Sequence, residues 1–187
     1  MRIIAGARRG RTLTAPDGQA TRPTSDRVRQ ALFDMLLHAP WGGRDLLDGT
    51  LVVDAFAGTG ALGLEALSRG AAEAVFFETD RAALGALRAN IATCGMRDRT
   101  RVIARDARRP PAAPRPAAVV FLDPPYRHDL VPAAWDALGG GGWVAPGTIV
   151  VAECARDEGL ELPGELLAER IHGAARISVW RPLVIKG

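Results

Sequence analysis

VDAFAGTGALG, residues Val53 to Gly63, is the stretch that decides the fold. It lies between the apolar run Leu51–Asp54, which predicts a buried strand, and a helical segment from Ala61 to about Ser68. Its three glycines have GxGxxG spacing (Gly58, Gly60 and Gly63). Glycine in such a turn lets the backbone bend sharply and approach a nucleoside or pyrophosphate closely. The stretch therefore predicts an α/β fold with a nucleotide-like cofactor, although a glycine turn without a ligand has the same pattern.

Strands and helices alternate on the C-terminal side of this turn, as in a mainly parallel sheet with helices on both faces. Strands are predicted at 51–54, 74–78, 101–104, 118–123, 148–153 and 175–180. Helices are predicted at about 61–68, 81–94 and 130–138. The proline-rich segment 107–117 is interpreted as a stiff spacer. Segment 155–173 has a mixed character, and no element is assigned to it.

Carboxylates end or follow the first four predicted strands, at the sheet edge where open α/β folds bind ligands (Asp54, Glu78, Asp106 and Asp123). Glu78 is placed to accept hydrogen bonds from ribose hydroxyls. Asp54 could face the amino group of a methionine moiety, and Asp106 an adenine amine. Such a set favours the zwitterionic sulfonium S-adenosylmethionine over NAD, whose pyrophosphate the carboxylates would repel. Each acid taken alone is better explained as a solvated loop carboxylate.

The fourth strand ends in FLDPPY, residues Phe121 to Tyr126. Pro124 and Pro125 stiffen the backbone, and nearby carbonyl oxygens can accept hydrogen bonds. With the Asp123 carboxylate and the flat ring of Tyr126, they could hold a planar ligand that carries an amino group. A proline-rich turn with aspartate as the turn former is the alternative interpretation.

The N-terminal segment is basic, since residues 1–29 have seven arginines against two acids, a net charge of +5. A short basic hairpin is predicted at 1–14, and a helix begins near Asp26, capped by Thr24 or Ser25. We therefore predict an N-terminal extension at 1–40 followed by the main domain at 41–187. The clustered charge indicates a polyanion partner, with six candidate phosphate ligands (Arg8, Arg9, Arg11, Arg22, Arg27 and Arg29). For two or three of them, we expect a solvated surface position or a helix salt bridge instead of a phosphate contact.

The composition places the chain among soluble intracellular proteins. At 187 residues it can bury a substantial core. Cys94 and Cys154 are far apart and outside any metal-site spacing, so we interpret both as reduced buried thiols and expect no metal. No apolar run has membrane-spanning length, and no signal peptide is evident, which predicts a cytoplasmic location.

Five motifs resemble the RsmD family of bacterial 16S ribosomal RNA guanine-N2 methyltransferases, within the class I methyltransferases. They are MRIIAG at 1–6, TRPTSDRVR at 21–29, DAFAGTGALGLEALSRGA at 54–71, ETD at 78–80 and LDPPY at 122–126. The resemblance runs from residue 1 to about 153. LDPPY is shared by many methyltransferases that act on exocyclic amines, whereas the N-terminal block is narrower. Gln30 and Asp34 depart from the family pattern, which has glutamate and asparagine there.

The resemblance implies a Rossmann-like class I methyltransferase fold with a mostly parallel seven-stranded sheet, preceded by the small basic hairpin and helix. It implies S-adenosyl-L-methionine as cofactor, bound by Asp54, Phe56, Gly58, Gly60, Glu78, Thr79, Asp106 and Asp123. It further implies methyl transfer to the N2 of a guanine in 16S rRNA, within a 30S subunit or an assembly intermediate, by a monomeric enzyme. Asp123 and the Pro124 carbonyl would accept the two amine hydrogens, and Tyr126 would stack on the base.

Three other functions remain open from the sequence. The same motif suits a DNA or RNA adenine-N6 methyltransferase. The glycine turn suits an NAD-linked oxidoreductase, and the basic N-terminus suits a non-catalytic RNA-binding module.

Overall fold

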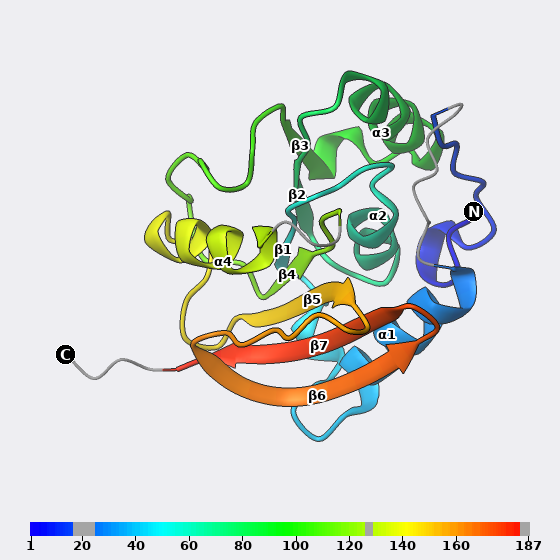
Figure 1. Cartoon of the computed structure of the whole chain (residues 1–187). Coiled ribbons are helices and arrows are strands. Elements are labelled where there is room, and N and C mark those ends of the chain that lie inside the picture. Colours follow the sequence, from blue (N-terminus) through cyan, green and yellow to red (C-terminus); the bar gives the residue numbers. More distant parts are fainter. Residues whose placement is uncertain (17–24, 126–128, 184–187) are drawn as a thin grey trace.

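A seven-stranded sheet with the order β3-β2-β1-β4-β5-β7-β6 forms the centre of the computed structural model, which describes residues 1–16, 25–125 and 129–183 (Figure 1). The strands are β1 (Leu51–Asp54), β2 (Glu73–Phe77), β3 (Thr100–Ile103), β4 (Val119–Leu122), β5 (Ile149–Ala155), β6 (Gly164–His172) and β7 (Ala175–Pro182). The first five are parallel, and β7 is antiparallel to both β5 and β6. The predicted Rossmann-like α/β fold is confirmed.

Four α-helices and three short 3-10 helices lie within the described residues. They are α1 (Asp26–His38), α2 (Ala61–Ser68), α3 (Arg81–Cys94), α4 (Leu130–Gly140), η1 (Gly6–Arg8), η2 (Arg44–Leu46) and η3 (Arg97–Arg99). Local chemistry sets the ends of the helices. The Ser25 hydroxyl accepts the N–H of Val28 at the start of α1, and the Asp80 carboxylate accepts the N–H of Ala83 at the start of α3. Gly95, at φ 62°, ends α3.

Two hydrophobic layers cover the two faces of the sheet. One joins α1, α2 and α3 to the sheet, and the other joins α4 and the segment before β4 to the opposite face (Figure 1). Trp135, Trp143 and Trp180 lie in the second layer. Ile3 and Leu13 of the N-terminal segment belong to the first layer, so this segment shares its core with the sheet. The division of the chain at residue 40 stays a prediction.

The structure adds one strand that the sequence did not reveal. β6 lies in segment 155–173, to which no element was assigned, and it forms the edge of the sheet next to β7. Its sequence, GELLAERIH, lacks regular alternation because most of the strand is exposed and a register shift falls between Leu166 and Ala168. An edge strand of this kind needs no continuous apolar face.

The predicted N-terminal hairpin is present as a short antiparallel pairing. Arg2 and Thr12 form the bridge, and the N–H of Ile3 donates to the carbonyl of Arg11 (2.9 Å). η1 forms the turn between the two arms. Within the described ranges, no helix is long and apolar enough to cross a membrane.

Candidate active site

The three glycines of the turn between β1 and α2 have different structural roles. Gly58 (φ 52°) faces open space, since a Cβ there would meet no atom within 4 Å. A Cβ on Gly63 would lie 2.4 Å from the ring of Phe76, and one on Gly60 (φ 79°) would lie 2.4 Å from Leu87. Gly60 and Gly63 therefore allow the turn to pack on the sheet and on α3. Only Gly58 offers the close backbone approach to a ligand that the spacing predicted for the whole motif.

Two carboxylates hold this turn. Oδ2 of Asp54 accepts the N–H of Gly63 (3.0 Å), and Asp54 is 2% exposed. Oε2 of Glu78 accepts the N–H of Gly58 (2.7 Å), while Oε1 accepts those of Thr79 (2.7 Å) and Asp80 (2.8 Å). The chain thus closes the turn with acceptors at the ends of β1 and β2.

The charge at the turn is negative. Burial raises the pKa of Asp54 to about 7; the bond from Gly63 opposes the rise and the charge of Glu78 adds to it. Among the described residues, no arginine or histidine forms an ion pair with Asp54 or Glu78. A cationic group would satisfy these carboxylates, whereas a pyrophosphate would be repelled. The residues present therefore fit the ammonium and sulfonium of S-adenosylmethionine better than NAD.

The other predicted cofactor residues lie nearby with different environments. Asp106 forms an ion pair with Arg108, whose Nη2 lies 2.6 Å from Oδ2 of Asp106. This guanidinium holds the pKa of Asp106 below its usual range. An adenine amine would have to share the Asp106 carboxylate with Arg108. Phe56 is half-buried against the second hydrophobic layer, which contains α4, and Thr79 is exposed.

Asp123, Pro124 and Pro125 follow β4 on the same sheet edge, next to β1. Pro124 is buried and Pro125 is exposed. Asp123 and Glu153 line a small hollow together with apolar residues of α1, α2 and three strands (Leu32, Leu62, Leu122, Val151 and Ile177). Glu153, which is 8% exposed, was not predicted as a site residue. Its position at the end of the predicted strand 148–153, like that of Asp123 at the end of the predicted strand 118–123, is the signal that could have identified it. Tyr126 lies outside the described residues.

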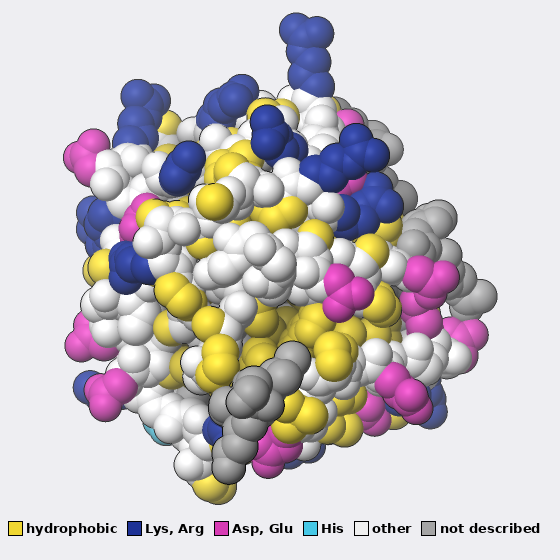
Figure 2. All heavy atoms as spheres, turned by 90° about the vertical axis from the view of Figure 1, so that its left-hand side faces the viewer, with side chains coloured by type: hydrophobic (Ala, Val, Ile, Leu, Met, Phe, Trp, Pro, Cys, Tyr) yellow, Lys and Arg dark blue, Asp and Glu magenta, His cyan; other side chains and the backbone are white. Residues whose placement is uncertain are grey.

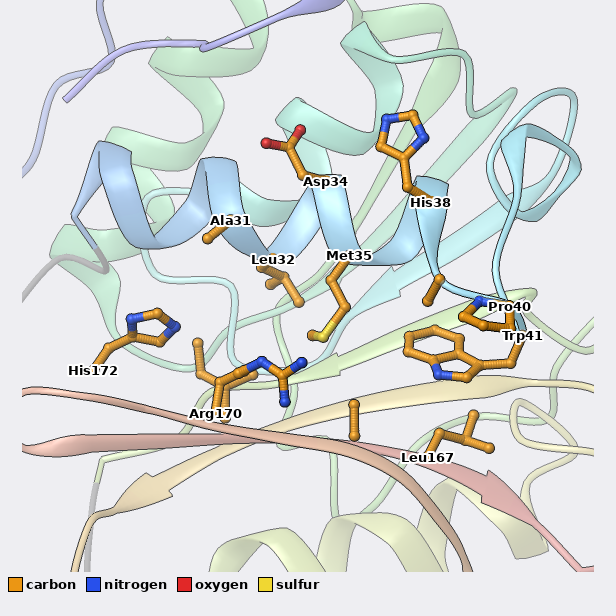
Figure 3. Close-up of a pocket in the computed structure, with 13 residues that line it drawn as sticks. Ala31, Leu32, Asp34, Met35, His38, Pro40, Trp41, Leu167, Arg170 and His172 are labelled. Atoms are coloured by element: carbon orange, nitrogen blue, oxygen red, sulfur yellow. The ribbon is translucent and has the colours of Figure 1, made fainter.

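A larger hollow of about 560 Å³ lies between α1 and the β6–β7 hairpin (Figure 3). Met35 and Leu167 point into it, and Arg170, His172 and His38 lie around it. It shares Leu32 and Ile177 with the hollow beside Asp123, and none of the predicted cofactor residues lines it. The hollow thus lies on the α1 side of the sheet, next to the smaller hollow beside Asp123.

The predicted RNA ligands divide into exposed and structural residues. Arg9, Arg11 and Arg27 are exposed, Arg8 is half-buried, and Arg22 lies outside the described residues. The prediction for Arg29 is wrong, because its side chain is 1% exposed and cannot reach RNA phosphates.

Arg29 is instead part of a buried network centred on Glu65 of α2. Arg29 donates to Oδ1 of Asp26 (3.0 Å) and to the carbonyl of Arg2, and its Nε lies 4.0 Å from Glu65. Glu65 is fully buried, forms an ion pair with Arg69 (2.7 Å) and accepts two backbone N–H groups of the N-terminal segment (Ile4 and Ala5). Glu65 therefore fixes the basic segment to the main fold. The sequence could not indicate this, since the partners are about 60 residues apart.

Gln30 and Asp34, which depart from the family pattern, contact one another. Nε2 of Gln30 donates to Oδ1 of Asp34 (2.6 Å) across one turn of α1. An amide is thus paired with a carboxylate at this position of α1.

Comparisons with known proteins agree with this geometry. The family model described as "Conserved hypothetical protein 95" matches residues 1–181. Ribosomal RNA small subunit methyltransferase D of Escherichia coli strain K12 is 41% identical over 161 residues, which cover 86% of this chain and 77% of that protein. The solved structure of yhhF from Escherichia coli has a TM-score of 0.82 and 35% identity, with 97% of each chain covered. An RNA methyltransferase from Salinibacter ruber, solved in complex with S-adenosyl-L-homocysteine, shares the fold at a TM-score of 0.64 and 20% identity, covering 87% of this chain and 95% of its own.

Proposed function

Because the chain belongs to the family described as conserved hypothetical protein 95, which is the RsmD family, we propose that it methylates 16S rRNA of the small ribosomal subunit. The methyl donor is S-adenosyl-L-methionine, and the acceptor is the exocyclic N2 of a guanine. One observation carries the proposal. The glycine turn, with the carboxylates of Asp54 and Glu78, and the Asp-Pro-Pro segment lie at the same edge of the sheet.

The cofactor role follows from the carboxylates around the turn. Asp54 would receive the ammonium of the methionine portion, and Glu78 the ribose hydroxyls next to Gly58, whose open face leaves room for the nucleoside. Glu78 already accepts three N–H groups, and a carboxylate offers about four lone-pair positions. One ribose hydroxyl can therefore bind without breaking a bond of the turn.

The methyl transfer would take place between this turn and Asp123. The lone pair of the guanine N2 is delocalised into the ring, so the nitrogen is a weak nucleophile. Asp123 and the Pro124 carbonyl would accept its two hydrogens and direct the lone pair at the methyl carbon. S-adenosylmethionine would supply the methyl group, and Asp123 or water would take the proton that the nitrogen loses.

The RNA would approach over the N-terminal segment, where Arg9, Arg11 and Arg27 are exposed. A 30S subunit or an assembly intermediate is the proposed substrate, methylated in the cytoplasm by a monomer. The guanine must leave its helix or loop to reach Asp123, and Tyr126 would stack on it there.

Labelled S-adenosylmethionine offered with 30S subunits, naked 16S RNA or DNA tests the proposal. Transfer to subunits or 16S RNA is expected, and transfer to DNA alone would favour the adenine-N6 methyltransferase. Calorimetric titration with S-adenosylmethionine and NADH tests the cofactor. Binding of NADH alone would overturn the proposal in favour of an oxidoreductase.

A further inference from the structure

A second basic region lies outside the N-terminal segment. Residues 81–115 contain nine arginines against two acidic residues, a net charge of +7, whereas the whole chain has +3. These arginines are distributed over α3, η3, β3 and the segment that follows β3. Because β3 is an edge strand of the sheet, they can gather on one side of the molecule.

Three of the nine arginines have structural partners. Arg99 donates to the carbonyls of Leu67 and Ala71 (2.7 Å each). Arg108 is paired with Asp106, and Arg115 with Glu73 (3.2 Å). The guanidinium groups of these three arginines therefore bind carbonyl or carboxylate oxygens of the protein itself.

The other six are exposed, and we call them the β3-edge patch (Arg81, Arg88, Arg97, Arg101, Arg105 and Arg109). Over the described ranges, none of the six forms an ion pair with a carboxylate. Figure 2 shows basic side chains gathered along the upper part of one face, the level at which Figure 1 places α3 and β3. Unpaired surface charge of one sign destabilises the fold by self-repulsion, so a polyanion that neutralises it would bind favourably.

The patch is continuous with the N-terminal basic segment. Nε of Arg8 donates to the carbonyl of Cys94, the last residue of α3 (2.6 Å), and Arg97 follows three residues later. Arg8 and Arg11 are both close enough to Cys94 for their charges to oppose the rise that burial causes in the pKa of its thiol. The N–H of Thr14 further ties this segment to Asn90 on α3 (2.8 Å).

We propose that the β3-edge patch binds phosphates of the RNA substrate, so that the RNA contacts run from the N-terminal hairpin past the end of α3 to β3. This inference rests on the proposed function for the identity of the polyanion. An anionic membrane is the less suitable partner, because a membrane-binding surface combines basic with large apolar side chains. The exposed large hydrophobic side chains among the described residues lie on β6 and after β7 (Leu166, Ile171 and Leu183).

The test compares two double variants that remove equal charge. Arg101→Gln with Arg105→Gln changes the patch, and Arg44→Gln with Arg156→Gln changes exposed arginines elsewhere. Binding of purified 16S RNA is measured from about 0.05 to 0.2 M salt. Because each neutralised phosphate contributes about 0.7 to 0.9 to the salt slope, the patch variant should lower the slope by roughly 1.5 and weaken binding about tenfold or more at 0.1 M salt.

The control variant should bind 16S RNA like the wild type, and both variants should keep the wild-type affinity for S-adenosylmethionine. Equal RNA binding and equal slopes in the two variants would overturn the patch proposal while wild-type methylation of 16S RNA still supported the function. A wild-type protein that neither binds nor methylates 16S RNA would instead refute the proposed function. If the patch variant lost binding to anionic lipid vesicles while its RNA binding was unchanged, the patch would bind a membrane and the RNA proposal would be overturned.

Discussion

Replacing Asp54 with asparagine should change how the stability of the protein depends on pH. Asparagine has almost the same shape, and its carbonyl can still accept the N–H of Gly63, but it has no charge. In the wild type, burial raises the pKa of Asp54 from 3.8 to about 7. The folded state therefore holds the Asp54 proton more tightly than the unfolded state does.

The sign and size of the effect follow from this difference. The contribution of protonated Asp54 to stability is fully present below about pH 4 and is lost as the pH rises through 7. The difference of about 3 between the pKa of Asp54 in the folded and the unfolded state corresponds to about 4 kcal/mol in the free energy of unfolding. Roughly 2.5 kcal/mol of this stability is lost between pH 5 and pH 8. The asparagine variant lacks this loss.

Urea unfolding of both proteins at pH 5 and pH 8 gives the comparison. Relative to the wild type, Asp54→Asn should gain about 2.5 kcal/mol between the two pH values. The control is Asp45→Asn, which removes an exposed carboxylate in η2 and should gain almost nothing. A gain for Asp54→Asn equal to that of the control would refute a proton held at Asp54 in the folded protein.

Three further variants test other parts of the structure. Glu65→Ala should destabilise the fold by about 3–5 kcal/mol in urea unfolding, because it leaves two buried arginines without their shared carboxylate; a loss below about 1 kcal/mol would contradict the buried network. Gly6→Ala should lower the melting temperature more than Gly10→Ala. Both glycines have positive φ, but only at Gly6 would a Cβ lie 1.8 Å from a backbone oxygen, that of Ser68, so equal losses would be inconsistent with this packing. Gly58→Ala should weaken binding of S-adenosylmethionine about tenfold by calorimetry and, because Gly58 has a positive φ, should cost about 1–2 kcal/mol of stability; an unchanged affinity would mean that the cofactor does not approach this turn.

The first half of the sheet could be predicted from sequence because its signals are local. β1 and β4 are buried apolar runs, and the glycines at 58, 60 and 63 mark the turn into α2. β6 lacked such a signal, since an exposed edge strand tolerates charged residues on both sides.

Interactions between distant segments could not be predicted in the same way. Arg29 belongs to a strongly basic stretch, yet Glu65 lies beside it in the fold and makes it structural. The arginines of the β3-edge patch are spread over α3, η3, β3 and the segment after β3, and the position of β3 at the sheet edge is not evident from sequence.

Identification of the methylated nucleoside tests the central claim most directly. 30S subunits that lack base methylation are incubated with the protein and labelled S-adenosylmethionine, and the digested 16S RNA is analysed by mass spectrometry. We predict N2-methylguanosine at one position, and a rate at least about 10²-fold lower for Asp123→Ala, which should still bind the cofactor. Label in adenosine, or an Asp123→Ala rate equal to that of the wild type, would contradict the account.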